Sequence, residues 1–281
     1  MKIDSVLKSA VERLTAAGVL DPRREAASLL AYAVKREPSF LIAHPEYELS
    51  AAESAAFESV LARRETREPF QYITGKQEFW GMDFNVAPGV LIPRPETEIL
   101  VEAAIEVLRP LQRPSFVEAG VGSGCISISI LHSIPTSSAT ATDLSDTALA
   151  LAAANAQKLG VADRLELQRS DLFSGVTGKF DLLVSNPPYI PDGDVRELQA
   201  EVRDFEPHSA LAGGPDGLDI VRRIVADARH ILRSCGVLML EIGAGQSAAV
   251  EQMFDLDIWE MPGIKYDLQA IARVITARLR S

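Results

Sequence analysis

The sequence predicts an α/β protein in which a seven-stranded, mostly parallel sheet is preceded by a small helical bundle and a connecting β-hairpin. Three observations support this prediction. Apolar residues recur at helical spacing through the first 75 residues, β-prone aromatic residues gather between 77 and 86, and short apolar strands alternate with helices from residue 115. The 281 residues, 47% of them hydrophobic and 24% charged, have globular composition and suffice for two domains.

An apolar stripe at the start of the chain predicts the first helix of the bundle. Its members lie at helical spacing, at Ile3, Val6, Leu7, Ala10, Val11 and Leu14. Gly18 follows as an expected C-terminal cap. Asp21 and Pro22 supply an N-cap and a first-turn proline for a second helix. Ser50 and Glu53 have capping-box spacing and are expected to open a helix that ends near residue 67.

A predicted hairpin at residues 77–86 follows the helices. Phe79, Trp80 and Phe84 are β-prone and surround a glycine that can form the turn. Prolines then interrupt regular structure before a helical pattern resumes at residue 96. We therefore expect residues 76–94 to link the two domains.

From residue 115 onward, short apolar strands are separated in most cases by helices. The expected strands are 116–118, 139–142, 165–168, 180–185, 237–241, 256–259 and 272–277. This alternation favours right-handed crossovers and parallel pairing. The chain then divides into a helical domain of residues 1–75, the linker of residues 76–94, and an α/β domain of residues 95–281. In open sheets of this kind, ligands bind beyond the C-terminal ends of the strands.

Composition and charge exclude several classes of protein. No apolar stretch approaches the ~20 residues that span a bilayer, and the first residues lack a signal-peptide core. Two cysteines fit a reducing cytosol, and four scattered histidines give no zinc-ligand spacing. The net charge is −11, and residues 1–75 carry 10 basic and 11 acidic side chains without a basic stripe. We therefore expect a cytoplasmic protein that contains no metal. We also expect that it binds no membrane and does not bind nucleic acid directly.

A glycine-rich turn follows the first predicted strand. Gly120, Gly122 and Gly124 alternate with Val121 and Ser123 before an apolar helix begins. Glycine permits a tight turn and lets a ligand lie against bare backbone. The spacing departs from the Gly-x-Gly-x-x-Gly dinucleotide fingerprint and favours a nucleoside cofactor that lacks a pyrophosphate.

Carboxylates follow the next two predicted strands. Asp143 ends the second strand, where a carboxylate can accept hydrogen bonds from both hydroxyls of a ribose. Asp171 follows the third strand, within reach of an adenine amine. Either could instead serve as a helix cap, and Asp143 with Ser145 has the pattern for one. The glycine-rich turn and the two carboxylates lie at successive strand ends and together predict a binding site for S-adenosyl-L-methionine. The product of the reaction would be S-adenosyl-L-homocysteine.

The fourth predicted strand runs into Asn186, Pro187, Pro188 and Tyr189. The prolines have no N–H, so the Asn186 and Pro187 carbonyls and the Asn186 side-chain oxygen can accept hydrogen bonds. A planar NH₂ group could have both hydrogens held there while Tyr189 packs on its face. An asparagine-capped proline turn is the alternative, but the full tetrapeptide after this strand indicates methylation of a planar nitrogen.

These motifs resemble those of the bacterial release factor glutamine methyltransferases, the PrmC or HemK family. Further segments that carry the resemblance are 71–75, 79–80, 91–98, 205–207, 210–211 and 214–217, so it covers essentially the whole chain. It implies the class I S-adenosylmethionine-dependent methyltransferase fold and N5-methylation of the glutamine in the Gly-Gly-Gln loop of class 1 peptide chain release factors. We also expect a monomer in which residues 1–75 recognise the substrate, because a glutamine amide alone offers too little surface to distinguish a release factor.

The resemblance assigns roles to particular residues. The catalytic residues are Asn186, Pro187 and Tyr189, with Pro188 completing the substrate-binding loop. The cofactor-binding residues are Gly120, Val121, Gly122, Ser123, Gly124, Asp143, Asp171, Leu172 and Asn186.

The sequence departs from the family pattern at three places. Glu118-Ala119 stands where Asp-Leu is usual, Leu172 stands where a bulkier residue often lies near the adenine, and Gln269-Ala270 replaces Ala-Gly. Two other functions compete. A DNA adenine-N6 or cytosine-N4 methyltransferase uses the same asparagine-proline motif on a flipped base but predicts a basic recognition domain. A non-catalytic adaptor for translation factors would not need intact cofactor and acceptor loops.

Overall fold

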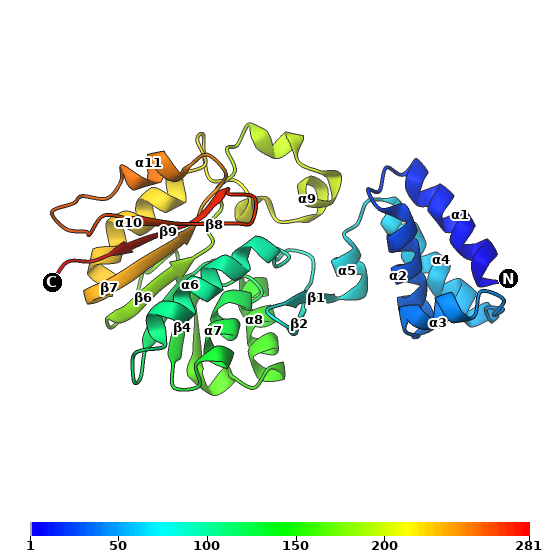
Figure 1. Cartoon of the computed structure of the whole chain (residues 1–281), viewed down its shortest axis with the longest axis horizontal. Coiled ribbons are helices and arrows are strands. Elements are labelled where there is room, and N and C mark those ends of the chain that lie inside the picture. Colours follow the sequence, from blue (N-terminus) through cyan, green and yellow to red (C-terminus); the bar gives the residue numbers. More distant parts are fainter. Residues whose placement is uncertain (1) are drawn as a thin grey trace. The chain divides into compact units, whose positions relative to one another are not determined.

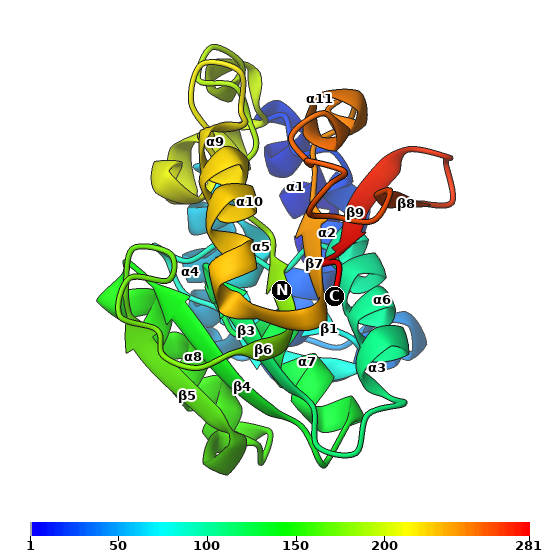
Figure 2. The same ribbon diagram turned by 90° about the vertical axis from the view of Figure 1, so that its left-hand side faces the viewer.

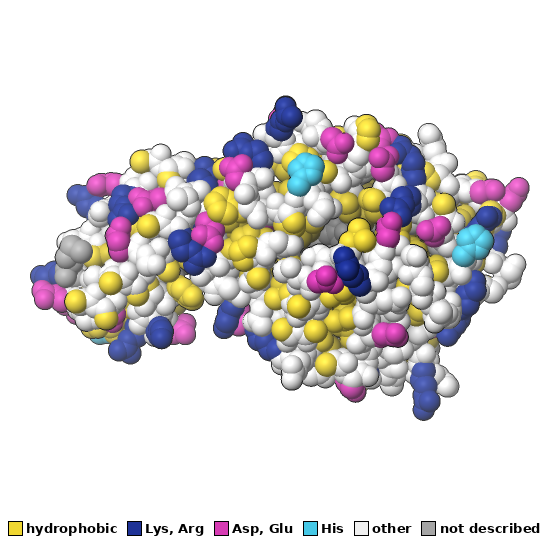
Figure 3. Space-filling model, turned by 180° about the vertical axis from the view of Figure 1, so that it is seen from behind, with side chains coloured by type: hydrophobic (Ala, Val, Ile, Leu, Met, Phe, Trp, Pro, Cys, Tyr) yellow, Lys and Arg dark blue, Asp and Glu magenta, His cyan; other side chains and the backbone are white. Residues whose placement is uncertain are grey.

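The computed structural model describes residues 2–281, which form two compact units (Figure 1). The smaller unit extends to Lys76 and includes the distant segment Gln199–Phe205. The larger unit comprises Gln77–Leu198 and Glu206–Ser281. None of the helices in residues 2–281 combines the length and the apolar character that a membrane span requires. On the face seen in Figure 3, Lys and Arg side chains are interspersed with Asp and Glu.

The smaller unit is helical. Its helices are α1 (Ile3–Ala16), α2 (Pro22–Val34), α3 (Pro38–Ala43), α4 (Ala51–Glu65), α5 (Phe70–Thr74) and α9 (Ala200–Phe205). Leu14, Leu29, Leu30 and Leu61 are at most 1% exposed and belong to one apolar core. The predicted stripe on α1 therefore faces that core, although α3 and α5 had no clear sequence signal.

The helix ends of this unit test the predicted caps. Gly18 has a φ of +76° just beyond α1, as a C-terminal glycine cap requires. Ser50 and Glu53 form a complete capping box at the start of α4. Asp21 occupies the N-cap position of α2, but its side chain makes no capping hydrogen bond. The predicted first-turn proline, Pro22, is in place.

Segment 199–205 belongs to the helical unit through ion pairs. Arg64 is 3% exposed and pairs with Glu25 and, at 2.8 Å, with Glu201 of α9. Arg67 also binds Glu201, with an Nη2–Oε2 distance of 2.5 Å. Removing one partner of a buried ion pair leaves the other charge uncompensated, so this cluster fixes α9 within the unit.

The predicted hairpin is present as β1 (Lys76–Phe79) and β2 (Met82–Asn85). Its two turn residues, Trp80 and Gly81, both have positive φ, at 55° and 69°. Such a pair suits the right-handed twist of a two-residue hairpin. The unfavourable backbone of Trp80 is held by a 2.7 Å hydrogen bond from its N–H to the Glu98 carboxylate.

The larger unit contains a seven-stranded sheet in the order β5-β4-β3-β6-β7-β9-β8 (Figure 1). The first five strands in that order are parallel, and β9 is antiparallel to both neighbours. The strands are β3 (Ser115–Ala119), β4 (Ser138–Asp143), β5 (Leu165–Arg169), β6 (Phe180–Ser185), β7 (Leu232–Glu241), β8 (Gly263–Tyr266) and β9 (Ala272–Arg278). This is the predicted class I methyltransferase fold.

One predicted strand is wrong. Residues 256–259 form a turn with a single isolated bridge, because the Asp255 carbonyl accepts the N–H groups of both Ile258 and Trp259. The Asp255 carboxylate also accepts a hydrogen bond from the Asp257 N–H, which stabilises the turn further. The remaining strand of the sheet is Gly263–Tyr266, an edge strand that is mostly exposed and so lacks an apolar alternation.

Helices cover both faces of the sheet and bury two apolar cores. Neighbouring residues on β3 point to opposite faces, so that Phe116 joins one core and Val117 the other. Figure 2 shows α6 and α7 on one side of the sheet and α10 on the other. The helices and short 3₁₀ segments are α6 (Glu98–Leu108), α7 (Cys125–Ser133), α8 (Asp146–Lys158), α10 (Asp219–Ile231), α11 (Ser247–Glu251), η1 (Pro95–Thr97), η2 (Ala162–Arg164), η3 (Asp194–Glu197) and η4 (His208–Ala210).

Candidate active site

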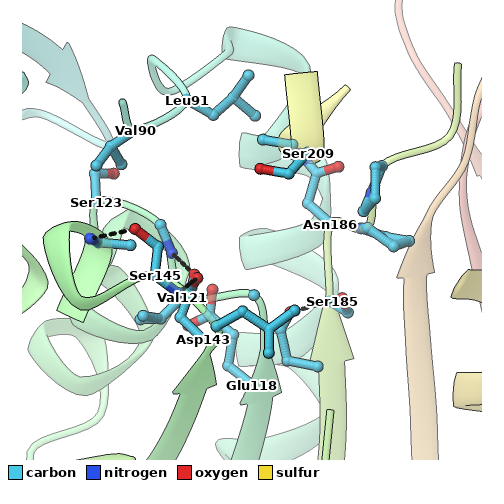
Figure 4. Close-up of a pocket in the computed structure, with 18 of the residues that line it drawn as sticks. Val90, Leu91, Glu118, Val121, Ser123, Asp143, Ser145, Ser185, Asn186 and Ser209 are labelled. Atoms are coloured by element: carbon cyan, nitrogen blue, oxygen red, sulfur yellow. Dashed lines mark hydrogen bonds between the residues drawn. The ribbon is translucent and has the colours of Figure 1, made fainter. Parts of the chain in front are cut away.

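A pocket of about 240 Å³ lies within the larger unit at the C-terminal ends of β3, β4, β5 and β6. Figure 4 shows Val121, Ser123 and Asp143 on one side of it and Asn186 and Ser209 on the other. Of the residues predicted from sequence, those that line it are Gly120, Val121, Gly122, Ser123, Asp143, Asp171, Leu172, Asn186, Pro187 and Pro188. Gly124 and Tyr189 are not part of the lining. Residues 89–94 contribute a further wall, as do Pro207, Ser209 and Ala210.

The glycine turn owes its shape to positive φ angles. Gly120, Gly122 and Gly124 have φ of 76°, 53° and 84°, which other L-residues adopt only with strain. A Cβ at Gly124 would lie 2.7 Å from the Ile128 Cδ1 atom and 3.3 Å from the Ala152 Cβ atom. Gly124 therefore lets the turn pack against α7 and α8, while the preceding residues form the pocket wall.

Asp143 ties the glycine turn to the end of β4. Its Oδ2 accepts the Gly122 N–H at 3.0 Å, and its Oδ1 accepts the Ser145 N–H at 2.9 Å (Figure 4). The N-cap of α8 is Ser145, whose hydroxyl accepts the Ala148 N–H at 3.2 Å. The alternative role for Asp143 as the cap of this helix is therefore wrong. Its carboxylate instead faces the pocket that it lines.

Asp171 and Leu172 lie at another part of the pocket wall. The Asp171 Oδ1 atom is 2.9 Å from Nη2 of Arg223, and about half of each side chain is exposed. An ion pair this exposed contributes little to stability, so both groups are free to rearrange around a ligand. Leu172 has a φ of 51°, which turns the chain directly after Asp171. The contribution of Arg223 from α10 had no sequence signal.

Glu118, the departure at the end of the first strand, is a buried carboxyl. It accepts the Ser127 N–H at 3.0 Å and is also hydrogen-bonded to the Ser127 hydroxyl, while its Oε1 has no partner among the described residues. Burial raises the pKa of Glu118 to about 8, and the Ser127 hydrogen bonds oppose that rise. The additional methylene of Glu118, compared with aspartate, extends its carboxyl towards α7.

Asn186 stands at the C-terminal end of β6 with its amide held in one orientation. Its Nδ2 donates to the Thr97 Oγ1 atom at 3.1 Å, which leaves the side-chain Oδ1 as the acceptor available to the pocket. The preceding Ser185 hydroxyl donates to the Ala119 carbonyl at 2.7 Å and so ties the acceptor loop to β3. Thr97 comes from the 91–98 segment and is 2% exposed.

Tyr189 is half-buried and is not part of the pocket lining. Its hydroxyl lies 3.4 Å from the Glu241 Oε1 atom, and a Cβ on Gly243 would lie 3.2 Å from its ring. Burial, and then the neighbouring Glu241 charge, raise the pKa of Tyr189 above its ordinary value. The carbonyl of Tyr189 accepts a 2.9 Å hydrogen bond from the Gln246 side chain. The residue is therefore fixed at its ring, its hydroxyl and its backbone.

The glycine-rich segment 213–217 supports the acceptor loop from behind. A Cβ at Gly213 would lie 2.6 Å from the Pro188 carbonyl oxygen, and one at Gly217 would overlap the Tyr189 carbonyl. The Gly213 N–H also donates to the Ile190 carbonyl at 2.9 Å. These contacts give the 214–217 motif a physical role, since only glycine leaves room for the loop backbone.

Two buried carboxyls near the acceptor loop were not predicted as site residues. Glu206 binds Arg94, a pocket residue, with an Nη2–Oε1 distance of 2.5 Å. Burial raises the pKa of Glu206, and Arg94 counteracts this. Glu241, at the end of β7, is 2% exposed. Segments 205–207 and 91–98 of the resemblance contain Glu206, Arg94 and Thr97 and could have indicated them, whereas Glu241 lay outside every motif.

Two protein families match separate parts of the chain. Residues 5–75 match the PrmC N-terminal domain, and residues 96–202 match the methyltransferase small domain. The boundary between these matches falls at the predicted hairpin segment.

Curated relatives match the chain along its length. The release factor glutamine methyltransferase of Cereibacter sphaeroides is 43% identical over 99% of both chains. That of Moorella thermoacetica is 44% identical over 90% of this chain and 89% of its own. Among solved structures, the T. Thermophilus 16S rRNA N2 G1207 methyltransferase, in complex with AdoMet and Guanosine, has a TM-score of 0.53 at 18% identity. That match covers 73% of this chain and 50% of the other and shows the shared fold.

Proposed function

Because the chain belongs to the release factor glutamine methyltransferase family, we propose that it methylates N5 of the glutamine in the Gly-Gly-Gln motif of class 1 peptide chain release factors, with S-adenosyl-L-methionine as methyl donor. One observation supports this best. A single pocket has the glycine turn and Asp143 on one wall and Asn186, with its side-chain oxygen available, on the other. The methyl donor and the substrate amide that accepts the methyl group can therefore bind next to each other in this pocket.

The cofactor site uses groups that suit the cofactor's chemistry. Each Asp143 oxygen accepts one hydrogen bond from the backbone and retains a lone pair that can accept a ribose hydroxyl. The turn at 120–123 offers bare backbone, and Asp171 and Leu172 line another part of the same pocket, where we assign the adenine. When bound, the cofactor supplies an electrophilic methyl group on sulfonium. The residues of the chain hold the cofactor and the substrate amide in the correct relative position.

The acceptor loop can orient the substrate amide, which is a weak nucleophile. The lone pair of a primary amide nitrogen is delocalised into its carbonyl, so the NH₂ must be oriented towards the methyl group. Asn186 Oδ1 and the Pro187 carbonyl accept its two hydrogens and hold that orientation. Correct alignment and exclusion of water lower the barrier by several kcal/mol, on the order of 7–11 kcal/mol at most. The positively charged nitrogen loses its proton after transfer.

Substrate recognition is assigned to the helical unit. A glutamine amide offers too little surface to distinguish a release factor, so binding energy must come from remote contacts. Residues 1–75 have an apolar core of their own and a near-neutral charge, which favours a protein partner over nucleic acid. The chain acts in the cytoplasm as a monomer without binding nucleic acid directly.

Mass spectrometry tests the function. Incubation with a class 1 release factor and S-adenosylmethionine should add one methyl group to the Gly-Gly-Gln peptide. Asn186→Ala should abolish most of the transfer at saturating cofactor, and the cofactor affinity is measured separately because Asn186 is also expected to contact the cofactor. A release factor that gains no methyl group, or methylation of a DNA duplex offered in parallel, would overturn the proposal.

A shortened chain tests the assignment of recognition. A chain that starts near Gly75 should bind S-adenosylmethionine but methylate the intact release factor poorly. A short Gly-Gly-Gln peptide should be a weak substrate for both chains, with a much smaller difference between them. Equal rates on the intact release factor would show that the helical unit is not the recognition module.

A further inference from the structure

Two arginines bring positive charge to the pocket at the strand ends. Arg94 comes from the loop before η1 and Arg223 from α10, and no other Lys, Arg or His of the described residues lines this pocket. The acidic residues of the lining are Glu118, Asp143 and Asp171. The two arginines therefore mark the places where the pocket can hold an anionic group of a ligand.

Arg223 already has an anionic partner in the pocket. Its Nη2 atom lies 2.9 Å from the Asp171 Oδ1 atom. Asp171 follows β5, and in the sheet β4 and β3 separate β5 from β6, the strand that leads into Asn186. The charge of Arg223 therefore belongs to the part of the pocket where we assign the adenine, and not to the acceptor side.

Arg94 lies on the acceptor side of the pocket. The Thr97 N–H donates to the Arg94 carbonyl at 3.1 Å, and the Thr97 Oγ1 atom accepts a hydrogen from Asn186 Nδ2 at 3.1 Å. Thr97 thereby connects the backbone of Arg94 to the side chain that we propose to hold the substrate amide. The Arg94 side chain is 32% exposed and lines the same pocket.

A buried carboxylate outside the pocket lining anchors the Arg94 guanidinium. The side chain of Glu206 is 1% exposed, and its Oε1 atom lies 2.5 Å from Arg94 Nη2. Both residues belong to the larger compact unit. This is the one hydrogen bond that the guanidinium makes to the described residues, so N–H groups on Nη1 and Nε stay available. An arginine held at one nitrogen can present a second pair of donors to another carboxylate.

The chemistry of the two proposed ligands shows which group this cation fits. The Gly-Gly-Gln segment of the substrate has no charged side chain. S-adenosyl-L-methionine has a single anionic group, the carboxylate of its methionine part, which a short carbon chain joins to the sulfonium. The methyl group on that sulfonium must reach the amide held by Asn186, while the ribose binds at Asp143. The methionine part therefore extends on the acceptor side, where Arg94 is the available cation.

We propose that Arg94, anchored by Glu206, binds the carboxylate of the methionine part of S-adenosyl-L-methionine. This inference rests on the proposed function, and it adds a cofactor-binding residue from segment 91–98 to those of the glycine turn and the strand ends. A guanidinium and a carboxylate form a charged and directional pair. Arg94 therefore also lets the pocket distinguish this cofactor from adenosine compounds that lack the carboxylate.

Calorimetric titration of the full chain with two ligands tests the inference. The ligands are S-adenosylmethionine and decarboxylated S-adenosylmethionine, which lacks only the carboxylate. Arg94→Met should weaken binding of the first roughly 10- to 100-fold, as expected for the loss of a charged hydrogen bond, and leave binding of the second unchanged. Arg203→Met removes an exposed arginine paired with Asp204 and is the control that should change neither affinity. An Arg94→Met chain with the wild-type ratio of the two affinities would overturn the proposal.

A double variant keeps the test decisive where Arg94→Met does not fold, since that change leaves the buried Glu206 without its partner. Arg94→Met combined with Glu206→Gln removes both charges and should show the same loss of preference for the carboxylated ligand. A wild-type preference in the double variant would refute the role of Arg94. The titrations need no methyl acceptor, so a chain that methylates no release factor but gives the expected ratios would contradict the proposed function alone.

Discussion

Replacement of Asp143 by alanine should weaken cofactor binding without unfolding the chain. The two oxygens of Asp143 hold the Gly122 and Ser145 N–H groups at 3.0 and 2.9 Å, and each retains one lone pair for a ribose hydroxyl. A hydrogen bond to a charged acceptor contributes about 1.5–3 kcal/mol. Loss of one such bond to the ribose therefore weakens binding roughly 10- to 100-fold. The loosened glycine turn adds to this loss.

Calorimetric titration with S-adenosylmethionine and S-adenosylhomocysteine measures the effect. Asp146→Ala is the matched control, because that carboxylate is 75% exposed and 3.5 Å from Arg169. It should leave the affinity unchanged. Ser145→Ala should lower the melting temperature, since it removes the cap of α8, but should affect binding less. A folded Asp143→Ala chain that binds the cofactor with wild-type affinity would refute the assigned role.

Three further predictions concern stability. Gly124→Ala should destabilise the chain by about 2–5 kcal/mol, because it combines left-handed strain with a 2.7 Å overlap; denaturant unfolding with an unchanged midpoint would contradict this. Arg64→Met leaves Glu25 without its partner, while Glu201 keeps Arg67, and should cost about 1–3 kcal/mol in the same assay. Glu118 has a folded-state pKa of about 8 against an ordinary 4.5, so the folded chain keeps a proton that the unfolded chain releases. Stability should therefore fall as the pH rises from about 4.5 to 8, and Glu118→Gln should reduce that slope in thermal melts.

The parallel strands were predictable from their apolar positions. β3 and β6 are buried on both faces, whereas the edge strand β5 alternates a buried Leu165 with an exposed Glu166. β3, β4, β5 and β6 begin and end within two residues of the ranges expected from their apolar runs. The edge of the sheet was not predictable in this way. Gly263–Tyr266 is mostly exposed and has no apolar run, whereas 256–259 has one but is held in a turn by Asp255. At residues 256–259, local hydrogen bonds determine the backbone conformation more strongly than the hydrophobic pattern does.

Loops at strand ends were predictable because the topology alone brings them together. Gly120, Asp143 and Asn186 line one pocket although they lie at the ends of three different strands. Residues that join the site only through tertiary packing gave no comparable signal. Arg223 comes from the exposed side of a helix, and Glu241 lies outside every recognisable motif. Glu201 likewise belongs to the helical unit through charge pairs between residues more than 130 positions apart.

The acceptor loop shows why such distant residues matter for the chemistry. A loop that offers its oxygens to a substrate cannot also use them all for its own stability. Asn186 and Pro187 line the pocket, whereas the carbonyls of Pro188 and Tyr189 face the glycine-rich segment 213–217 and Tyr189 also accepts from Gln246. The backbone contacts of Pro188 and Tyr189 behind the loop thus fix the position of Asn186 and Pro187, which line the pocket. Because glycine alone fits this close approach, Gly217→Ala should impair transfer as strongly as a change in the motif itself, with cofactor affinity retained.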